Sequence, residues 1–167
     1  SETIIDYLDL QVLAGANALM IFDTWGGILS EARYLAHSLH FMTHIVKAIK
    51  AKHPTIPVIL FTKGGGLWLP SIAQSGCDAV GIDWTCSLSH AKKLVGHQVA
   101  LQGNLHPSIL LTSPAVIKDE VAKVLASFGQ GPGHVFNLGH GITPDVPPAH
   151  VTAMIEAVRE LSPAYHI

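Results

Sequence analysis

Short apolar runs and helical patterns alternate along the chain. Apolar residues at helical spacing predict helices over residues 1–12, 30–52, 89–95, 113–128 and 148–161, and a short one around 69–73. The last helix is expected to turn an apolar stripe that includes Ile155 toward the core. Between the helices lie five apolar runs, predicted as strands at residues 18–22, 57–61, 79–82, 98–101 and from residue 134 to His140.

These strands are continuous apolar runs without polar alternation. Such runs are typical of parallel sheets that helices cover on both faces, and strands that alternate with helices indicate an α/β protein. Two architectures remain open at this point. One is a five-stranded doubly wound sheet, and the other is part of a (β/α)8 barrel, whose complete form needs about 250 residues. No linker or low-complexity tract is found, so one domain over residues 1–167 is expected.

Composition restricts the class of protein. The chain is 49% hydrophobic and 13% charged, with a net charge of −2, and its mean hydropathy of +0.37 indicates extensive burial. No apolar run reaches the roughly 20 residues of a membrane span, and the lack of a Lys/Arg cluster argues against nucleic acid as a partner. Cys77 and Cys86 fit a reduced, cytoplasmic protein.

The first residues form part of a helical pattern rather than a leader. They have no basic segment and no apolar core, so no signal peptide is predicted. Because the sequence starts inside this pattern without an initiator methionine, we expect the true start of the protein to lie elsewhere.

Each predicted strand ends in polar residues. In both parallel architectures, ligands bind at the carboxyl ends of the strands. Glycines, which permit tight turns and close approach of the backbone to a ligand, stand beside most of these ends. The pattern therefore predicts one polar site. Its candidate residues are Asp23, Thr24, Thr62, Lys63, Asp83, Gln102, Asn104 and His140.

Histidines are unusually common, and most are not candidates for chemistry. His140 stands between two glycines at a strand end, where an imidazole can hydrogen-bond or pair with a carboxylate. His37, His40 and His44 share one face of the helix over 30–52, and no carboxylate or cysteine joins them there. A solvated helix face is therefore expected rather than a metal site. No glycine-rich segment has the context of a nucleotide-binding loop.

The strand ends also resemble a known family. The matching stretches read IFDTWGG at 21–27, LFTKGGG at 60–66, GIDWT at 81–85, VALQGN at 99–104, HVFNLGHGI at 134–142 and DVPP at 145–148. In this order they resemble the bacterial type of uroporphyrinogen decarboxylase, in its C-terminal half. One departure is His106, which stands where the family usually has aspartate.

The resemblance implies a partial (β/α)8 TIM barrel, with about five of the eight βα units. It implies an enzyme, usually a homodimer, that needs neither metal nor organic cofactor. This enzyme decarboxylates the four acetate side chains of uroporphyrinogen III to give coproporphyrinogen III. Thr24 and His140 match positions that contact the tetrapyrrole, His140 through a carboxylate. The family's catalytic residues belong to its N-terminal half, so none is expected in this chain.

Charge counting agrees with an incomplete site. Arg33 and Arg159, the only arginines, lie on predicted helices, and Lys63 is the one basic side chain besides His140 at a strand end. These charges could not hold the eight carboxylates of the substrate. The isolated chain is therefore expected to be inactive.

Two other functions remain open. Cobalamin-dependent methyltransferases of the same superfamily bind zinc through a His-x-Cys pair and a later cysteine, but residues 23–25 and 139–141 contain no cysteine. The alternative is a non-catalytic half-barrel that self-associates, because open strand edges and exposed apolar faces favour association.

Overall fold

The computed structural model describes residues 1–166 as two compact units that divide between Gly81 and Ile82. Ile167, the last residue of the predicted domain, lies outside the described residues. The first unit contains α1 (Glu2–Leu13), β1 (Leu19–Asp23), η1 (Gly26–Ile28), α2 (Glu31–Tyr34), η2 (Leu35–Leu39), α3 (His40–Lys52), β2 (Val58–Thr62), η3 (Gly65–Trp68), α4 (Leu69–Ala73) and β3 (Ala79–Gly81). The second contains α5 (Leu88–Val95), β4 (Ala100–Gln102), η4 (Pro107–Leu111), α6 (Pro114–Phe128), β5 (His134–Val135), α7 (Pro148–Leu161) and η5 (Ser162–Tyr165).

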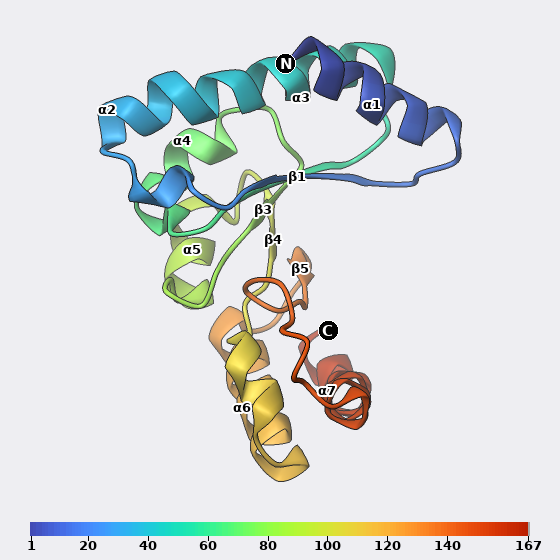
Figure 1. Cartoon of the computed structure of the whole chain (residues 1–167). Coiled ribbons are helices and arrows are strands. Elements are labelled where there is room, and N and C mark those ends of the chain that lie inside the picture. Colours follow the sequence, from blue (N-terminus) through green and yellow to red (C-terminus); the bar gives the residue numbers. More distant parts are fainter. Residues whose placement is uncertain (167) are drawn as a thin grey trace. The chain divides into compact units, whose positions relative to one another are not determined.

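The strands of the first unit are parallel and in register with their carboxyl ends together. β1 pairs with β2 from Leu19 opposite Val58 to Asp23 opposite Thr62, and β2 pairs with β3. Figure 1 shows α1 and α3 lying along each other on one side of β1. This register brings the end of β1 and the end of β2 to the same edge, which is where the sequence predicts polar chemistry.

The helix predicted over 30–52 contains a wider turn. It runs as α2, a π-helical turn at η2, and α3. Single π-helical turns inside α-helices are rare and are frequently found at functional sites. The apolar face expected from Leu35, Leu39, Met42, Val46 and Ile49 is confirmed in all but its first member, because the last four are buried and Leu35 is 37% exposed.

The second unit pairs β4 with β5 in parallel and packs two helices against each other. Figure 1 shows α6 and α7 side by side. Their shared core is apolar, as the helical spacing predicts. The buried members are Leu105, Leu110, Ile117, Val121, Leu125, Val146 and Ala157.

Several details differ from the sequence predictions, of which the main ones are these. The fifth strand is shorter than expected and ends at Val135, after which one bridge joins Leu105 and Leu138. The fourth strand lies later, at β4. The helical turn η4 was not predicted. Ile155 is 42% exposed rather than buried, and Ala157 takes the inward position on α7.

Candidate functional site at the strand ends

Asp23, the last residue of β1, holds the loop that follows it. Its Oδ1 atom accepts hydrogen bonds from the backbone N–H of Gly26 at 2.7 Å and of Trp25 at 3.3 Å. Its Oδ2 atom accepts a hydrogen bond from the hydroxyl of Ser38, which belongs to the π-helical turn η2. The carboxylate therefore fixes the turn that contains Thr24, which is partly exposed.

Thr62, the last residue of β2, is bound to a buried tyrosine. The hydroxyls of Thr62 and Tyr34 lie 2.8 Å apart, and Tyr34 is fully buried. The Tyr34 ring stacks on Trp68 with 4.1 Å between centroids. Burial raises the pKa of Tyr34 to about 12, since the charged phenolate is disfavoured away from water. The hydrogen bond from Thr62 opposes this shift in part, and the charge of Asp23 adds to it.

The loops after β1 and β2 touch through glycine. A Cβ atom on Gly27 would lie 1.9 Å from the carbonyl oxygen of Lys63, so only glycine allows this approach. These two loops also carry exposed apolar side chains, with Trp25 after β1 71% exposed and Leu67 after β2 86% exposed. The first unit thus presents a fixed backbone with apolar groups directed to solvent.

In the second unit, the polar residue after β3 also fixes its own turn. Asp83 is buried, and its Oδ1 atom accepts hydrogen bonds from the N–H of Thr85 at 2.8 Å and from its hydroxyl at 2.5 Å. The Nδ2 group of Asn104 donates to the carbonyl oxygens of Asp83 at 2.9 Å and Cys86 at 2.6 Å. These groups tie the loops after β3 and β4 together.

Trp84 lies between two histidines that follow different strands. Its ring centroid is 4.4 Å from that of His106 and 6.5 Å from that of His140, which meets the indole edge to face at 88°. Gly139 permits this packing, since a Cβ atom there would lie 2.7 Å from the backbone nitrogen of Trp84. Gly141 meets no such neighbour, so only one of the two glycines that flank His140 serves the packing of this site.

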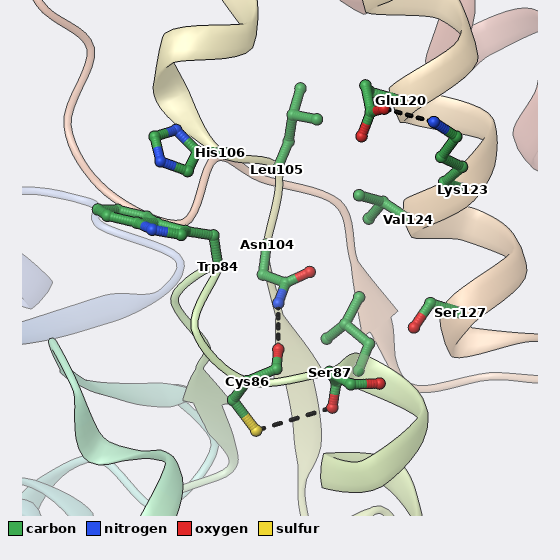
Figure 2. Close-up of a pocket in the computed structure, with 11 residues that line it drawn as sticks. Trp84, Cys86, Ser87, Asn104, Leu105, His106, Glu120, Lys123, Val124 and Ser127 are labelled. Atoms are coloured by element: carbon green, nitrogen blue, oxygen red, sulfur yellow. Dashed lines mark hydrogen bonds and ion pairs between the residues drawn. The ribbon is translucent and has the colours of Figure 1, made fainter.

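A cavity of about 270 Å³ opens beside this aromatic group (Figure 2). Trp84 and His106 lie on one side of Asn104 and Leu105, and side chains of α6 lie on the other. Glu120 and Lys123 of α6 form an ion pair at 2.6 Å. The remaining lining residues are Cys86, Ser87, Leu88, Val124 and Ser127.

Cys86 in this cavity is a protonated thiol at neutral pH. Burial raises its pKa, and the charge of Asp83 raises it further. Its thiol lies 3.7 Å from the carbonyl oxygen of Ser87, to which it donates a hydrogen bond. The side chain is therefore a poor nucleophile.

The predicted strand-end residues have different structural roles. Asp23, Asp83 and Asn104 fix turns, and Thr62 binds Tyr34. Thr24 belongs to the first unit and His140 to the second. His37, His40 and His44 are exposed, as predicted for a solvated face. Within residues 1–166, no group of three or more His, Cys, Asp or Glu side chains is placed to hold a metal ion.

Sequence reasoning missed three contributors to the site. Ser38 is one, because a π-helical turn leaves no mark in a 3.6-residue pattern. Tyr34 and Trp84 are the others, since an aromatic residue in an apolar context is ordinarily core. The position of Trp84 directly after a strand-end aspartate was the one available signal.

Solved structures with the same fold are found among α/β barrels. A methyltransferase from Methanosarcina mazei superposes with a TM-score of 0.82 at 22% identity, over 96% of this chain and 47% of that one. An archaeal fructose 1,6-bisphosphate aldolase has a TM-score of 0.57 at 16% identity, over 94% of this chain and 61% of that one. These likenesses concern the fold alone. The protein is thus an α/β protein with five of the strands of a TIM barrel, as predicted.

The sequence comparisons identify the family. Residues 1–161 match the family model for uroporphyrinogen decarboxylase (URO-D). The uroporphyrinogen decarboxylase of Legionella pneumophila (strain Lens) is 59% identical over 167 residues, which cover all of this chain and 47% of that protein. That of Pseudomonas putida (strain GB-1) is 55% identical over 168 residues, with 99% and 48% covered. The chain belongs to the uroporphyrinogen decarboxylase family, and it spans about half the length of these curated relatives.

Across the described part of the chain, no helix is both long and apolar enough to cross a bilayer.

Proposed function

We propose that this chain is part of a uroporphyrinogen decarboxylase, a carboxy-lyase that converts uroporphyrinogen III to coproporphyrinogen III by removing carbon dioxide from four acetate side chains. The observation that carries the proposal is the family match over residues 1–161, which includes every strand end described above. The polar and aromatic groups gathered at these ends support it.

Thr24 and His140 are proposed as substrate contacts, with His140 bound to a carboxylate of the tetrapyrrole. The edge-to-face contact with Trp84 restricts the orientation of the His140 imidazole. The hydrogen bonds from the N–H groups of Trp25 and Gly26 to Asp23 close a turn around Thr24 and hold the backbone that carries its hydroxyl. A fixed donor loses little conformational freedom when the ligand binds, which favours recognition.

The isolated chain is proposed to be inactive, because the reaction needs groups that this chain uses elsewhere. Loss of carbon dioxide from a pyrrole acetate requires a protonated ring, and a fixed carboxylate stabilises the positive charge that develops. At the strand ends, Asp23 and Asp83 are engaged by their own turns. The catalytic carboxylate would come from the remaining length of the enzyme. The proposal includes no metal or organic cofactor.

We further propose that the protein acts in the cytoplasm as a homo-oligomer. The first unit exposes apolar side chains on α1 and β1, with Leu10 63%, Leu13 72% and Phe22 67% exposed. Exposed large apolar side chains of this kind favour association. Light scattering at micromolar concentration is expected to show a dimer or larger species, and a clean monomer would contradict this part of the proposal.

The enzymatic assay compares the chain alone with a complete barrel. We would join residues 1–167 to the remaining half of the Legionella relative and follow coproporphyrinogen formation by chromatography. The complete protein is expected to turn over, and the chain alone is not. Replacing His140 by Asn in the complete protein is expected to raise KM about tenfold, since a hydrogen bond to a charged group is lost.

The matched control for this assay is His40→Asn, which changes an exposed histidine on α3. A complete barrel without activity would overturn the proposed function. Product formed by residues 1–167 alone would overturn only the proposal that the catalytic group lies elsewhere.

A further inference from the structure

Trp84 belongs to a turn whose backbone is fixed on both sides of the indole. Before it, the carbonyl oxygen of Asp83 accepts a hydrogen bond from Nδ2 of Asn104 at 2.9 Å. After it, the backbone N–H of Thr85 donates to Oδ1 of Asp83 at 2.8 Å, and that of Cys86 donates to the Asp83 carbonyl oxygen at 3.4 Å. The turn is therefore closed, and the backbone of Trp84 has little freedom.

The residue before His140 packs against this turn. Gly139 is buried, and a Cβ atom on it would lie 2.7 Å from the backbone nitrogen of Trp84 and 3.2 Å from Cα of Asp83. Its own N–H donates to the carbonyl oxygen of Leu105 at 2.7 Å. Only glycine allows so close an approach. The backbone that carries His140 is thus fixed against the backbone that carries Trp84.

The imidazole of His140 meets the indole of Trp84. The ring centroids are 6.5 Å apart and the rings are at 88°, an edge-to-face arrangement that aromatic pairs prefer at about 4.5–7 Å. On the other side of His140, no atom of residues 1–166 lies within 4 Å of a Cβ atom placed on Gly141. Close packing beside His140 in the chain therefore comes from the side of Gly139 and Trp84, and the indole limits where the imidazole can point.

The indole is also in contact with a second imidazole. The ring centroids of Trp84 and His106 are 4.4 Å apart, with the rings tilted by 46° (Figure 2). An indole that is partly buried and touched by two imidazoles offers a ligand little surface of its own. Its influence on a bound carboxylate would therefore pass through His140.

Orientation matters for the contact proposed for His140. A hydrogen bond from an imidazole N–H to a carboxylate weakens steeply once the donor angle falls below about 120°. An imidazole that is already held in one orientation also loses less conformational freedom when the ligand binds. A neighbour that fixes the ring can thus strengthen substrate binding without touching the substrate.

We infer that Trp84 is a positioning residue, which holds the His140 imidazole in the orientation that binds a carboxylate of the tetrapyrrole and does not itself contact the substrate. This inference rests on the proposed function. It assigns the aromatic residue after β3 a part in substrate binding that acts through another side chain.

The test is a double-mutant cycle in the complete barrel described above. Trp84→Leu is expected to raise KM for uroporphyrinogen by about two- to tenfold with kcat little changed, because the edge-to-face contact is lost. Trp84→Phe keeps an aromatic ring and should have a KM between those of Trp84→Leu and the wild type. When His140→Asn is already present, Trp84→Leu should raise KM by less than about twofold, since residues that act through each other are not additive. His40→Asn serves again as the control.

Two further measurements separate positioning from a general loss of structure. Thermal unfolding checks each variant, and if Trp84→Leu does not fold, Trp84→Phe takes its place in the cycle. In protein with carbon-13-labelled histidine, the ring resonance of His140 is identified by its absence from His140→Asn. That resonance should shift in Trp84→Leu, because the ring current of the indole is removed.

The outcomes distinguish the two proposals. A raised KM that depends on His140, together with a shifted His140 resonance, supports the inference. Increases in KM that multiply in the double variant show that Trp84 acts independently of His140 and overturn the inference. Wild-type KM or an unshifted resonance in folded Trp84→Leu also overturns it, and each of these results leaves the proposed function standing. A wild-type complete barrel that forms no coproporphyrinogen overturns the proposed function and the inference with it.

Discussion

The hydroxyl oxygen of Tyr34 lies 2.8 Å from Oγ1 of Thr62, and this bond joins the helix after β1 to the carboxyl end of β2. Both side chains are buried, with Tyr34 at 0% and Thr62 at 3% exposure. A buried hydroxyl pair is stable only while both groups are neutral and bonded to each other. The contact therefore fixes two strand ends and makes that arrangement sensitive to alkali.

Stability is expected to fall in alkali because of Tyr34. Its pKa is about 12 in the folded protein, against an ordinary value of 10.0. Its contribution is complete below pH 10 and is lost as the pH rises toward 12, because the unfolded chain ionises first. The loss amounts to about 2–3 kcal/mol at most. Urea denaturation at pH 9 and pH 11 measures it.

Tyr34→Phe is the matched control. The variant should lose about 1 kcal/mol at neutral pH, since the hydrogen bond to Thr62 is gone. Its stability should then depend less on alkaline pH than that of the wild type. Equal slopes for the two proteins between pH 9 and pH 11 would show that Tyr34 does not cause the loss.

Removing the Ser38 hydroxyl is expected to loosen the loop that carries Thr24. Ser38→Ala deprives Oδ2 of Asp23 of a donor, at a cost of about 1–3 kcal/mol for a charged acceptor. In the complete barrel, Ser38→Ala should raise KM. Ser38→Thr, which keeps a hydroxyl, should have a KM between those of Ser38→Ala and the wild type. Denaturation and steady-state kinetics provide the two measurements. A stability loss with unchanged KM would show that the loop does not depend on this bond.

The order of elements could be read from the sequence because burial fixes it. A short apolar run such as 57–61 is buried on both faces only inside a sheet, and β2 begins one residue after the predicted strand. The fifth strand was predicted too long. Only His134 and Val135 form it, and after them Asn137 and Gly139 exchange backbone hydrogen bonds with Leu105 alone. Apolar character does not reveal where a partner strand ends.

The roles of polar strand-end residues could not be read in the same way. A carboxylate after a strand suits a ligand and a turn equally well, and only coordinates show that Asp23 and Asp83 hold N–H groups of their own loops. The effect of His106 was also unpredictable. Its Nδ1 atom caps η4 at 3.1 Å from the N–H of Ser108, so the turn persists.

Both cysteines are expected to react slowly with thiol reagents in the folded protein. Burial raises the pKa of Cys77 and of Cys86, so less of each is thiolate at a given pH. Labelling with iodoacetamide at pH 8 should be slower than for a free thiol, and slower for the buried Cys77 than for Cys86. Labelling in urea should restore ordinary rates. Fast modification of Cys86 in the native protein would contradict the burial of its thiol.

Acid is expected to destabilise the second unit through His134. This imidazole stacks on Phe128 at 4.6 Å, and its Nε2–H donates to the carbonyl oxygen of Gly103 at 2.8 Å. Burial lowers its pKa below the ordinary 6.5, and the charges of His166 and Lys92 lower it further, although the bond to Gly103 opposes the shift. The folded state therefore binds this proton less readily than the unfolded chain. Its contribution to stability is present above pH 6.5 and is lost as the pH falls through the lowered pKa.

His134→Phe tests this sensitivity, because it keeps the aromatic stack and removes the titrating group. The variant should be less stable by about 1–3 kcal/mol at pH 7.5, since the carbonyl of Gly103 loses its donor. It should lose less stability than the wild type between pH 7.5 and pH 5. The other histidines are present in both proteins, so the difference between the two slopes reports the removal of His134. Parallel slopes, or an NMR titration that places His134 above its ordinary pKa, would contradict the prediction.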